Sequence, residues 1–190
     1  MFNSAKKFES ELGKLTIPNR EFHKLALERQ NMLTKPRGSL GRLEDLACFI
    51  AMWQENERPK SEKAQALVFA GNHGVCDQGI NPFPQEITVQ MVENFNRGGA
   101  AINQLASQNG AKLQVVLLAE GKQTSDITKG PAMSEGECLD AINVGANSVD
   151  FDSDILLLGE MGIGNSTISA ALCLASFGGK SKDWVGAGTG

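Results

Sequence analysis

The stretch DILLLGEMGIGNST, residues 154–167, runs from an apolar segment through a glutamate into a glycine-rich turn. A short, continuous apolar run is typical of a strand that is buried on both faces of a parallel sheet. The alanine-rich segment 165–177 that follows predicts a helix. Strand, turn and helix in this order predict an α/β unit, with Glu160 at the carboxyl end of a central strand. A carboxylate among apolar residues is costly unless it is paired or used, so this strand end is a candidate site.

The alternation of apolar runs and helical segments continues along the chain. Three further runs predict strands: ALVFA (66–70), KLQVVLLAE (112–120) and DWVGAGTG (183–190). Helices are expected at 85–95, 100–108 and 134–146, the last of which begins with the capping-box sequence SEGE. Short strands separated by helices predict an α/β fold with an open, mostly parallel sheet flanked by helices, in a Rossmann-like three-layer arrangement.

The first sixty residues have a different, helical pattern. Apolar residues recur at turn-like spacing, which predicts helices at 7–15, 19–33 and 40–54. Ser39 is the expected N-cap of the third helix. We therefore expect two parts. Residues 1–60 form an N-terminal helical segment, part of a small domain, and residues 61–190 form an α/β nucleotide- or base-binding domain that is incomplete at its C-terminus.

The composition argues against several classes of function. A net charge of −4 gives no electrostatic basis for binding nucleic acid. No apolar run has membrane-spanning length, and the first residues lack the hydrophobic segment of a signal peptide. The four cysteines form no CxxC pair and there are two histidines, so we expect neither a metal site nor a cofactor. Reduced thiols in a cytoplasmic protein are the simplest interpretation.

Three of the four predicted strands end in glycine-containing loops: GNHGV (71–75), GEMGIGN (159–165) and GAGTG (186–190). Ligands of open α/β sheets bind beyond the carboxyl ends of the strands. If these strands are neighbours, the three loops meet in one crevice. We therefore predict that the bends at Gly74, Gly162 and Gly188 share a common rim.

The loop 159–165 permits two interpretations. Its free N–H groups and the dipole of the following helix could hold a phosphate, although its spacing differs from the Rossmann and P-loop motifs. It could instead be a tight turn in which Asn165 or Ser166 caps the helix. In that case Glu160 could form a salt bridge with a lysine or arginine from another loop.

Three other segments also permit either a functional or a purely structural interpretation. His73 could line the site or be a hydrogen-bonded structural residue, since nothing nearby supplies a nucleophile for it to activate. Phe83 could form one wall of an aromatic slot, although the sequence alone favours packing in the core. The basic residues of TKPRGSLGRLE (34–44) could meet an anion, but a helix cap and turn is the simpler interpretation.

Five segments together resemble one enzyme family, and they occur in that family's order and spacing from about residue 30 onward. They are KPRGSLGRLEDLA, ALVFAGNHGV, PFPQEITVQMVENFNRGGAAIN, LLLGEMGIGNSTISAAL and VGAGTG. They closely resemble the nicotinate-nucleotide:dimethylbenzimidazole phosphoribosyltransferases of cobalamin (vitamin B12) biosynthesis. That family of glycosyltransferases converts nicotinate mononucleotide and 5,6-dimethylbenzimidazole into α-ribazole 5′-phosphate and nicotinate. Its members are typically homodimers.

The resemblance implies roles for residues in four segments. Glu160 corresponds to an active-site glutamate, which we expect to stabilise positive charge near the anomeric carbon or to orient the ribose. The other implied substrate-binding residues are Phe83, Pro84, Gln85 and Met91 at the benzimidazole slot, Met161, Gly162, Gly164 and Asn165 at the junction of base and nucleotide, Gly186 and Gly188 in a second phosphate loop, and, more weakly, Asn72 and His73.

The sequence also departs from the family. Asn72 stands where aspartate is usual, and Arg37 stands where proline is common. The family's general base and its phosphate-loop lysine would both lie beyond Gly190, so the resemblance implies an N-terminal piece with little or no transferase activity. Two alternatives stay open: a non-catalytic module that binds a benzimidazole or nucleotide, and a different nucleotide-using α/β enzyme.

Overall fold

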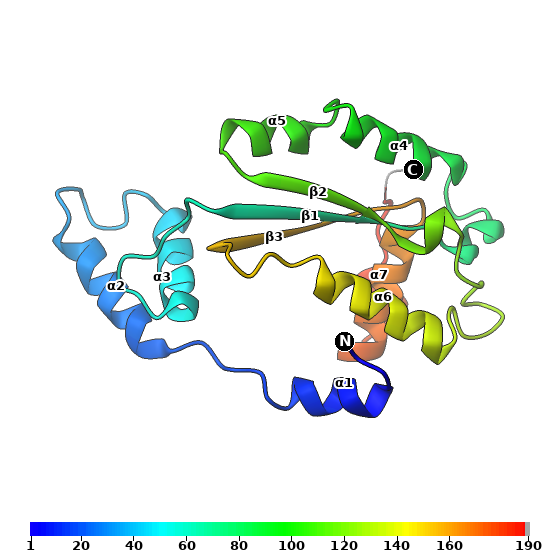
Figure 1. The fold of residues 1–190 in the computed structure, drawn as a ribbon, viewed down its shortest axis with the longest axis horizontal. Coiled ribbons are helices and arrows are strands. Elements are labelled where there is room, and N and C mark those ends of the chain that lie inside the picture. The colour runs from blue at the N-terminus through cyan, green and yellow to red at the C-terminus, as the bar shows by residue number, and fades with distance from the viewer. Residues whose placement is uncertain (189–190) are drawn as a thin grey trace.

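The structure is a computed structural model, in which residues 1–188 are described (Figure 1). Its helices and strands alternate through most of the chain. In chain order they are α1 (Ala5–Leu12), α2 (Arg20–Met32), α3 (Arg42–Gln54), β1 (Ala64–Ala70), η1 (Gly74–Gln78), α4 (Glu86–Asn96), α5 (Ala101–Gln108), β2 (Lys112–Leu117), η2 (Leu118–Gly121), α6 (Glu135–Asn147), β3 (Ile155–Met161), α7 (Asn165–Phe177) and α8 (Ser181–Trp184).

The three strands form one parallel sheet in the order β2-β1-β3. Val68 of the central strand pairs with Val115 on one side and with Gly159 on the other. Figure 1 shows α4 and α5 on one side of the sheet and α6 and α7 on the other. The predicted open parallel sheet flanked by helices is therefore confirmed.

The buried side chains of the sheet belong to the central strand β1 and not to β3. In β1 the side chains of Ala66, Leu67 and Ala70 are almost completely buried. In β3, Leu156, Leu157 and Leu158 are 38%, 49% and 72% exposed. The prediction that this leucine run is buried on both faces, within a central strand, is wrong for the part of the chain that the structure describes. The physical reason is that β3 has β1 on one side and, within residues 1–188, no strand on the other.

The predicted fourth strand is also absent from the described part of 183–190, which ends at residue 188. Ser181–Trp184 form the short helix α8 instead. Local contacts hold this helix: Asp183 Oδ2 accepts from the backbone N–H of Lys180 at 3.0 Å, and Trp184 Nε1 donates to the carbonyl of Gly178 at 2.8 Å. Trp184 also stacks on Phe177 with ring centroids 5.8 Å apart.

Two element boundaries differ from the prediction, and one helix cap agrees with it. The strand expected at 112–120 ends at Leu117 and is followed by η2. The third helix is preceded by Gly41 rather than by Ser39, because Glu44 Oε1 accepts from the N–H of Leu40 at 3.2 Å and orders the preceding turn. At α6 the predicted capping box is confirmed, since Ser134 and Glu137 each accept the other's backbone N–H.

The N-terminal helices contact different parts of the molecule. Helices α2 and α3 pack against each other around Ala26, Cys48 and Ala51. The segment before α1 instead reaches α6, where the backbone of Phe2 exchanges two hydrogen bonds with the amide of Asn143, at 2.6 and 2.7 Å. The division at residue 60 stays a prediction. Within residues 1–188, every helix is too short or too polar to cross a membrane.

Candidate functional site

The loops after β1 and β3 lie against each other at the carboxyl end of the sheet. The backbone N–H of Gly71 donates to the carbonyl of Met161 at 3.0 Å. One step further along both loops, His73 Nε2 donates to Asn165 Oδ1 at 2.5 Å. The Sγ–H of Cys76 donates to the carbonyl of Ile163 at 3.2 Å. These three contacts join segments that are about ninety residues apart in the sequence.

The segment that contains Gly188 also reaches the carboxyl end of the sheet. A Cβ atom built on Gly188 would lie 3.1 Å from Ser166 Oγ, in the first turn of α7. Gly74 sits behind the rim, where a Cβ would lie 2.7 Å from the backbone nitrogen of Asp126. The loops that contain Gly162 and Gly188 therefore meet at the start of α7, and the β1 loop joins them through Gly71 and His73. The prediction that Gly74 itself lies on this common rim is wrong, because it packs against residues 124–126. Gly186 is exposed, and no atom lies within 4 Å of a Cβ built on it.

Close approach of backbone explains two of the glycines in the β3–α7 loop. A Cβ on Gly162 would collide with the carbonyl oxygen of Gly71 and with the side chain of Asn165. Gly164 has φ +87°, and a Cβ there would lie 2.7 Å from Cys76 Sγ. An alanine at either position would therefore push the β1 and β3 loops apart.

Helix α7 begins without a side-chain cap. Its N-cap residue is Gly164, and Asn165 directs its amide oxygen to His73 rather than to the helix N-terminus. The alternative in which Asn165 or Ser166 caps this helix is therefore wrong. The backbone N–H groups of Asn165 and Thr167 donate to the carbonyls of Gly162 and Gly164. Because no side chain caps the helix, the backbone N–H of Ser166 can bind an anionic group such as a phosphate.

Helix α4 is attached to the same loop through a buried threonine. Thr88 is completely buried, and its Oγ1 accepts from the backbone N–H of Ile163 at 3.3 Å. The sequence analysis missed this residue. The sequence does carry a signal for Thr88. It precedes Met91, Val92 and Phe95 by three, four and seven residues, so its hydroxyl lies on the apolar face of a helix. Thr88 fixes the position of α4 relative to the candidate site.

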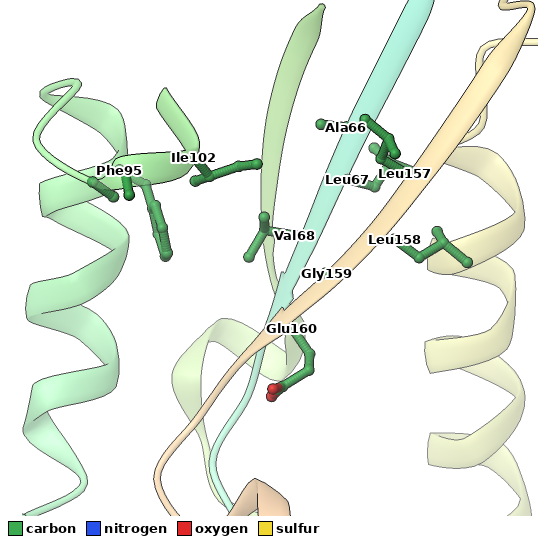
Figure 2. Close-up of a pocket in the computed structure, with 11 residues that line it drawn as sticks. Ala66, Leu67, Val68, Phe95, Ile102, Leu157, Leu158, Gly159 and Glu160 are labelled. Atoms are coloured by element: carbon green, nitrogen blue, oxygen red, sulfur yellow. The ribbon is translucent and has the colours of Figure 1, made fainter. Parts of the chain in front are cut away.

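Glu160 lies at the end of an apolar groove (Figure 2). The groove has a volume of about 370 Å³ and lies between β1, β3 and the helices α4 and α5. It is lined by Ala66, Leu67, Val68, Phe95, Ala100, Ala101, Ile102, Leu157, Leu158, Gly159 and Glu160. Glu160 is exposed and has no ion pair within residues 1–188, so the salt-bridge alternative finds no support there.

The groove and the predicted benzimidazole slot involve different residues of the α4 region. Phe95 and Ile102 line the groove, whereas Phe83 and Met91 do not. Phe83 is 46% exposed, so core packing, which the sequence favoured, is wrong for this residue. Gln85, beside it, donates from Nε2 to Gln123 Oε1 at 2.6 Å. The sequence analysis did not single out Phe95 or Ile102 as site residues.

Asn72 is buried at the end of the central strand. Its Nδ2 donates to the carbonyl of Gly121 at 2.9 Å, while its Oδ1 has no hydrogen-bond partner in the described part of the chain. Burial of an unpaired acceptor costs about 1–3 kcal/mol. The Oδ1 of Asn72 can therefore accept a further hydrogen bond.

The segment behind the rim is held by an ionised aspartate. Asp126 accepts from the backbone N–H of Thr128 at 2.9 Å and from Gln78 Nε2 at 2.7 Å, and these bonds hold the pKa of its carboxyl well below its usual value. Burial raises the pKa of the Cys76 thiol, so Cys76 serves as a neutral donor in the loop. Residues 1–188 contain no group of three or more potential metal ligands.

Comparison with known proteins gives a consistent result. Residues 15–190 match a protein-family model described as "Phosphoribosyltransferase". A relative from Rhodobacter capsulatus, named nicotinate-nucleotide–dimethylbenzimidazole phosphoribosyltransferase, is 56% identical over 188 residues, which are 99% of this chain and 56% of the relative. A relative of the same name from Ruegeria pomeroyi is 50% identical, over 97% of this chain and 55% of its own length.

A solved structure is also similar. The crystal structure of CobT from Thermus thermophilus matches with a TM-score of 0.78 and 34% sequence identity, over 90% of this chain and 57% of that chain. The chain therefore spans little more than half the length of the relatives that it matches.

Proposed function

Since the chain belongs to the nicotinate-nucleotide–dimethylbenzimidazole phosphoribosyltransferase family, we propose that it forms the substrate-binding part of such an enzyme. In the proposed reaction, phosphoribose moves from nicotinate mononucleotide to 5,6-dimethylbenzimidazole. A ring nitrogen of the benzimidazole attacks C1′, the bond from C1′ to nicotinate breaks, and the other ring nitrogen loses its proton to a base. The products are α-ribazole 5′-phosphate and nicotinate.

The observation that carries this proposal is the junction of the β1 and β3 loops through His73 and Asn165. It places the uncapped N-terminus of α7 beside the end of the central strand. We propose that N–H groups of this turn bind the phosphoribosyl part, with Met161, Gly162, Gly164 and Gly188 forming its walls. Gly186 and the unpaired Oδ1 of Asn72 are weaker candidates in the same region.

For Glu160 we propose an electrostatic role. Its carboxylate lies next to the apolar groove and has no cationic partner within residues 1–188. A carboxylate there would stabilise the positive charge that develops on the ribose as the bond to nicotinate breaks. The planar base would lie toward α4, near Phe83, Pro84, Gln85 and Met91.

Titration calorimetry with nicotinate mononucleotide and with dimethylbenzimidazole tests the proposal. We expect the chain to bind both compounds, and Glu160→Ala to bind them within a few-fold of the parent. In the complete enzyme the same change should reduce turnover by about 10²–10³-fold, because the carboxylate acts mainly in the transition state. Glu28→Ala, an exposed glutamate on α2, is the control. Unchanged turnover of the Glu160 variant would remove its assigned role.

A second function is an alternative, because the joined β1 and β3 loops could hold a ligand without turnover. On this alternative the 190 residues are a module that binds a benzimidazole or nucleotide without turnover. Binding without product formation, even when the rest of a relative is supplied, would favour it.

The proposal also includes a cytoplasmic location and a homodimer in the complete protein. All four cysteines are free, as is usual in a reducing compartment. Sedimentation of a complete enzyme would test the dimer.

A further inference from the structure

The hydrogen bond between His73 and Asn165 fixes the orientation of the Asn165 side-chain amide. Asn165 Oδ1 lies 2.5 Å from His73 Nε2, and an amide oxygen only accepts hydrogen bonds, so Nε2 carries the proton. If the amide were turned over, its own N–H groups would face this N–H. The imidazole therefore selects one of the two orientations that the amide can adopt.

Packing holds the same amide from another side. A Cβ built on Gly162 would collide with Asn165 Oδ1 and lie 3.0 Å from its Cγ, so the amide lies directly against the backbone of Gly162. The backbone N–H of Asn165 also donates to the carbonyl of Gly162 at 3.3 Å. Because its backbone and its amide oxygen are both held, the side chain has little freedom to turn.

The orientation leaves the amide nitrogen of Asn165 as a free donor. Nδ2 carries two N–H groups, and neither has a partner within residues 1–188. Asn165 is the first residue of α7, and the neighbouring backbone N–H of Ser166 has no side-chain cap. Asn165 is half-buried and Ser166 is exposed, so a ligand can reach both. This turn offers donors only, which suits a phosphate group, whose ionised oxygens only accept.

We propose that His73 is a positioning residue for the phosphate of nicotinate mononucleotide, because it holds the Asn165 amide so that Nδ2 donates to a phosphate oxygen. The inference rests on the proposed function, and it gives His73 a role there without contact with the substrate. An amide that is already oriented loses less freedom when the ligand binds, so its hydrogen bond adds more to the affinity. In the opposite orientation Oδ1 would face the phosphate oxygens, and acceptors would repel each other.

Titration calorimetry of the 190-residue chain with two ligands tests the inference. The ligands are nicotinate mononucleotide and nicotinate riboside, which lacks only the phosphate. His73→Ala should weaken binding of the mononucleotide about tenfold, the effect of one hydrogen bond to a charged group, and should change binding of the riboside by less than about twofold. His73→Gln should restore most of the affinity, because its Nε2–H can still donate to Asn165 Oδ1.

The control is His23→Ala, which removes the other histidine of the chain. His23 lies on α2, at the opposite end of the sheet from these loops (Figure 1). We expect this variant to bind both ligands like the parent. Urea unfolding of every variant checks that binding is measured on folded protein.

A double-mutant cycle tests whether His73 acts through Asn165. Asn165→Ala should weaken mononucleotide binding at least as much as His73→Ala does. When residue 165 is alanine, His73→Ala should cause no further loss, because the amide that it orients is gone. If His73→Ala does not fold, Asn165→Asp provides the test, since it keeps the acceptor for His73 but replaces the N–H donors by a carboxylate oxygen. It should weaken binding of the mononucleotide more than that of the riboside.

Three results would overturn the inference and leave the proposed function intact. Equal losses for the two ligands, in His73→Ala or in Asn165→Asp, would show that these side chains only join the loops. Additive losses in the cycle would show that His73 acts on the substrate independently of Asn165. Full affinity of His73→Ala for the mononucleotide would show that the orientation has no effect. A parent chain that binds neither ligand would contradict the proposed function, and this inference with it.

Discussion

At the residue scale, the site depends on glycines, which have no side chain, as well as on side chains that form contacts. Gly162 allows the β3 loop to touch the carbonyl of Gly71, and His73 then reaches Asn165. The sequence indicated Gly162 and Glu160 because both lie in one short local pattern. It could not indicate Thr88 or Cys76 as loop anchors, because their partners lie 75 and 87 residues away and are brought close only by the tertiary fold.

Gly162→Ala should destabilise the chain by about 1–3 kcal/mol, because the new methyl group overlaps the backbone of the neighbouring loop. Urea unfolding measures the change. Gly130→Ala is the matched control, since a methyl group added at Gly130 would have no atom within 4 Å and the residue has no positive φ. Equal stability of the two variants would show that the loops are not in contact.

Thr88→Val should cost about 1–3 kcal/mol, because it keeps the shape of the side chain but leaves the buried N–H of Ile163 without an acceptor. Thr88→Ser keeps the hydroxyl and should retain the hydrogen bond. Amide hydrogen exchange at Ile163 reports the difference. Faster exchange in the valine variant alone is expected, and the same rate in both variants would contradict the assigned bond.

At the element scale, local signals predicted the helices well and the sheet less well. The capping box of α6 uses only residues within one turn, so the sequence was sufficient to place it. Whether β3 is a central or an edge strand depends on which other segments pair with it, and this information is not contained in its own leucines. The segment 183–188 is not a strand because the contact of Asp183 with Lys180, at the start of α8, and that of Trp184 with Gly178, at the end of α7, favour a helical turn.

The stability that the turn before α3 contributes should depend on pH. Lys35 Nζ lies 2.6 Å from Glu44 Oε1, and this contact, with the N–H of Leu40, lowers the pKa of Glu44 from its ordinary 4.5. A lowered folded-state pKa gives stability that is present above about pH 4.5 and is lost as the pH falls through the folded-state pKa.

Glu44→Gln should therefore reduce the free energy of unfolding more at neutral pH than in acid. Urea unfolding at a series of pH values compares it with Glu28→Gln, an exposed glutamate on α2. A deficit of Glu44→Gln that stays constant down to acid pH would contradict an ionic role for this contact.

At the scale of the whole molecule, the chain is similar in fold to a solved relative, and it spans about half of the relatives' length. The parallel sheet could be predicted because strands and helices alternate along the sequence. The exposure of β3, and the groove beside it, could not be predicted, because they depend on which segments are available to cover them.

The 190-residue chain alone should form α-ribazole phosphate far more slowly than a complete relative. We expect from the family resemblance that the general base is not among these residues, and general-base catalysis contributes about 10²–10⁴-fold. Chromatography of α-ribazole phosphate after incubation with both substrates gives the comparison, with the complete Rhodobacter capsulatus enzyme as reference. Comparable rates would show that these residues contain the base.

The central claim is that the joined β1 and β3 loops bind the phosphoribosyl part of the substrate. A crystal structure of the chain with nicotinate mononucleotide tests it most directly. We predict the ribose phosphate beside residues 162–166, within hydrogen-bond distance of backbone N–H groups at the start of α7. Nicotinate mononucleotide bound away from these loops, or loops that are separated in the crystal, would contradict the account.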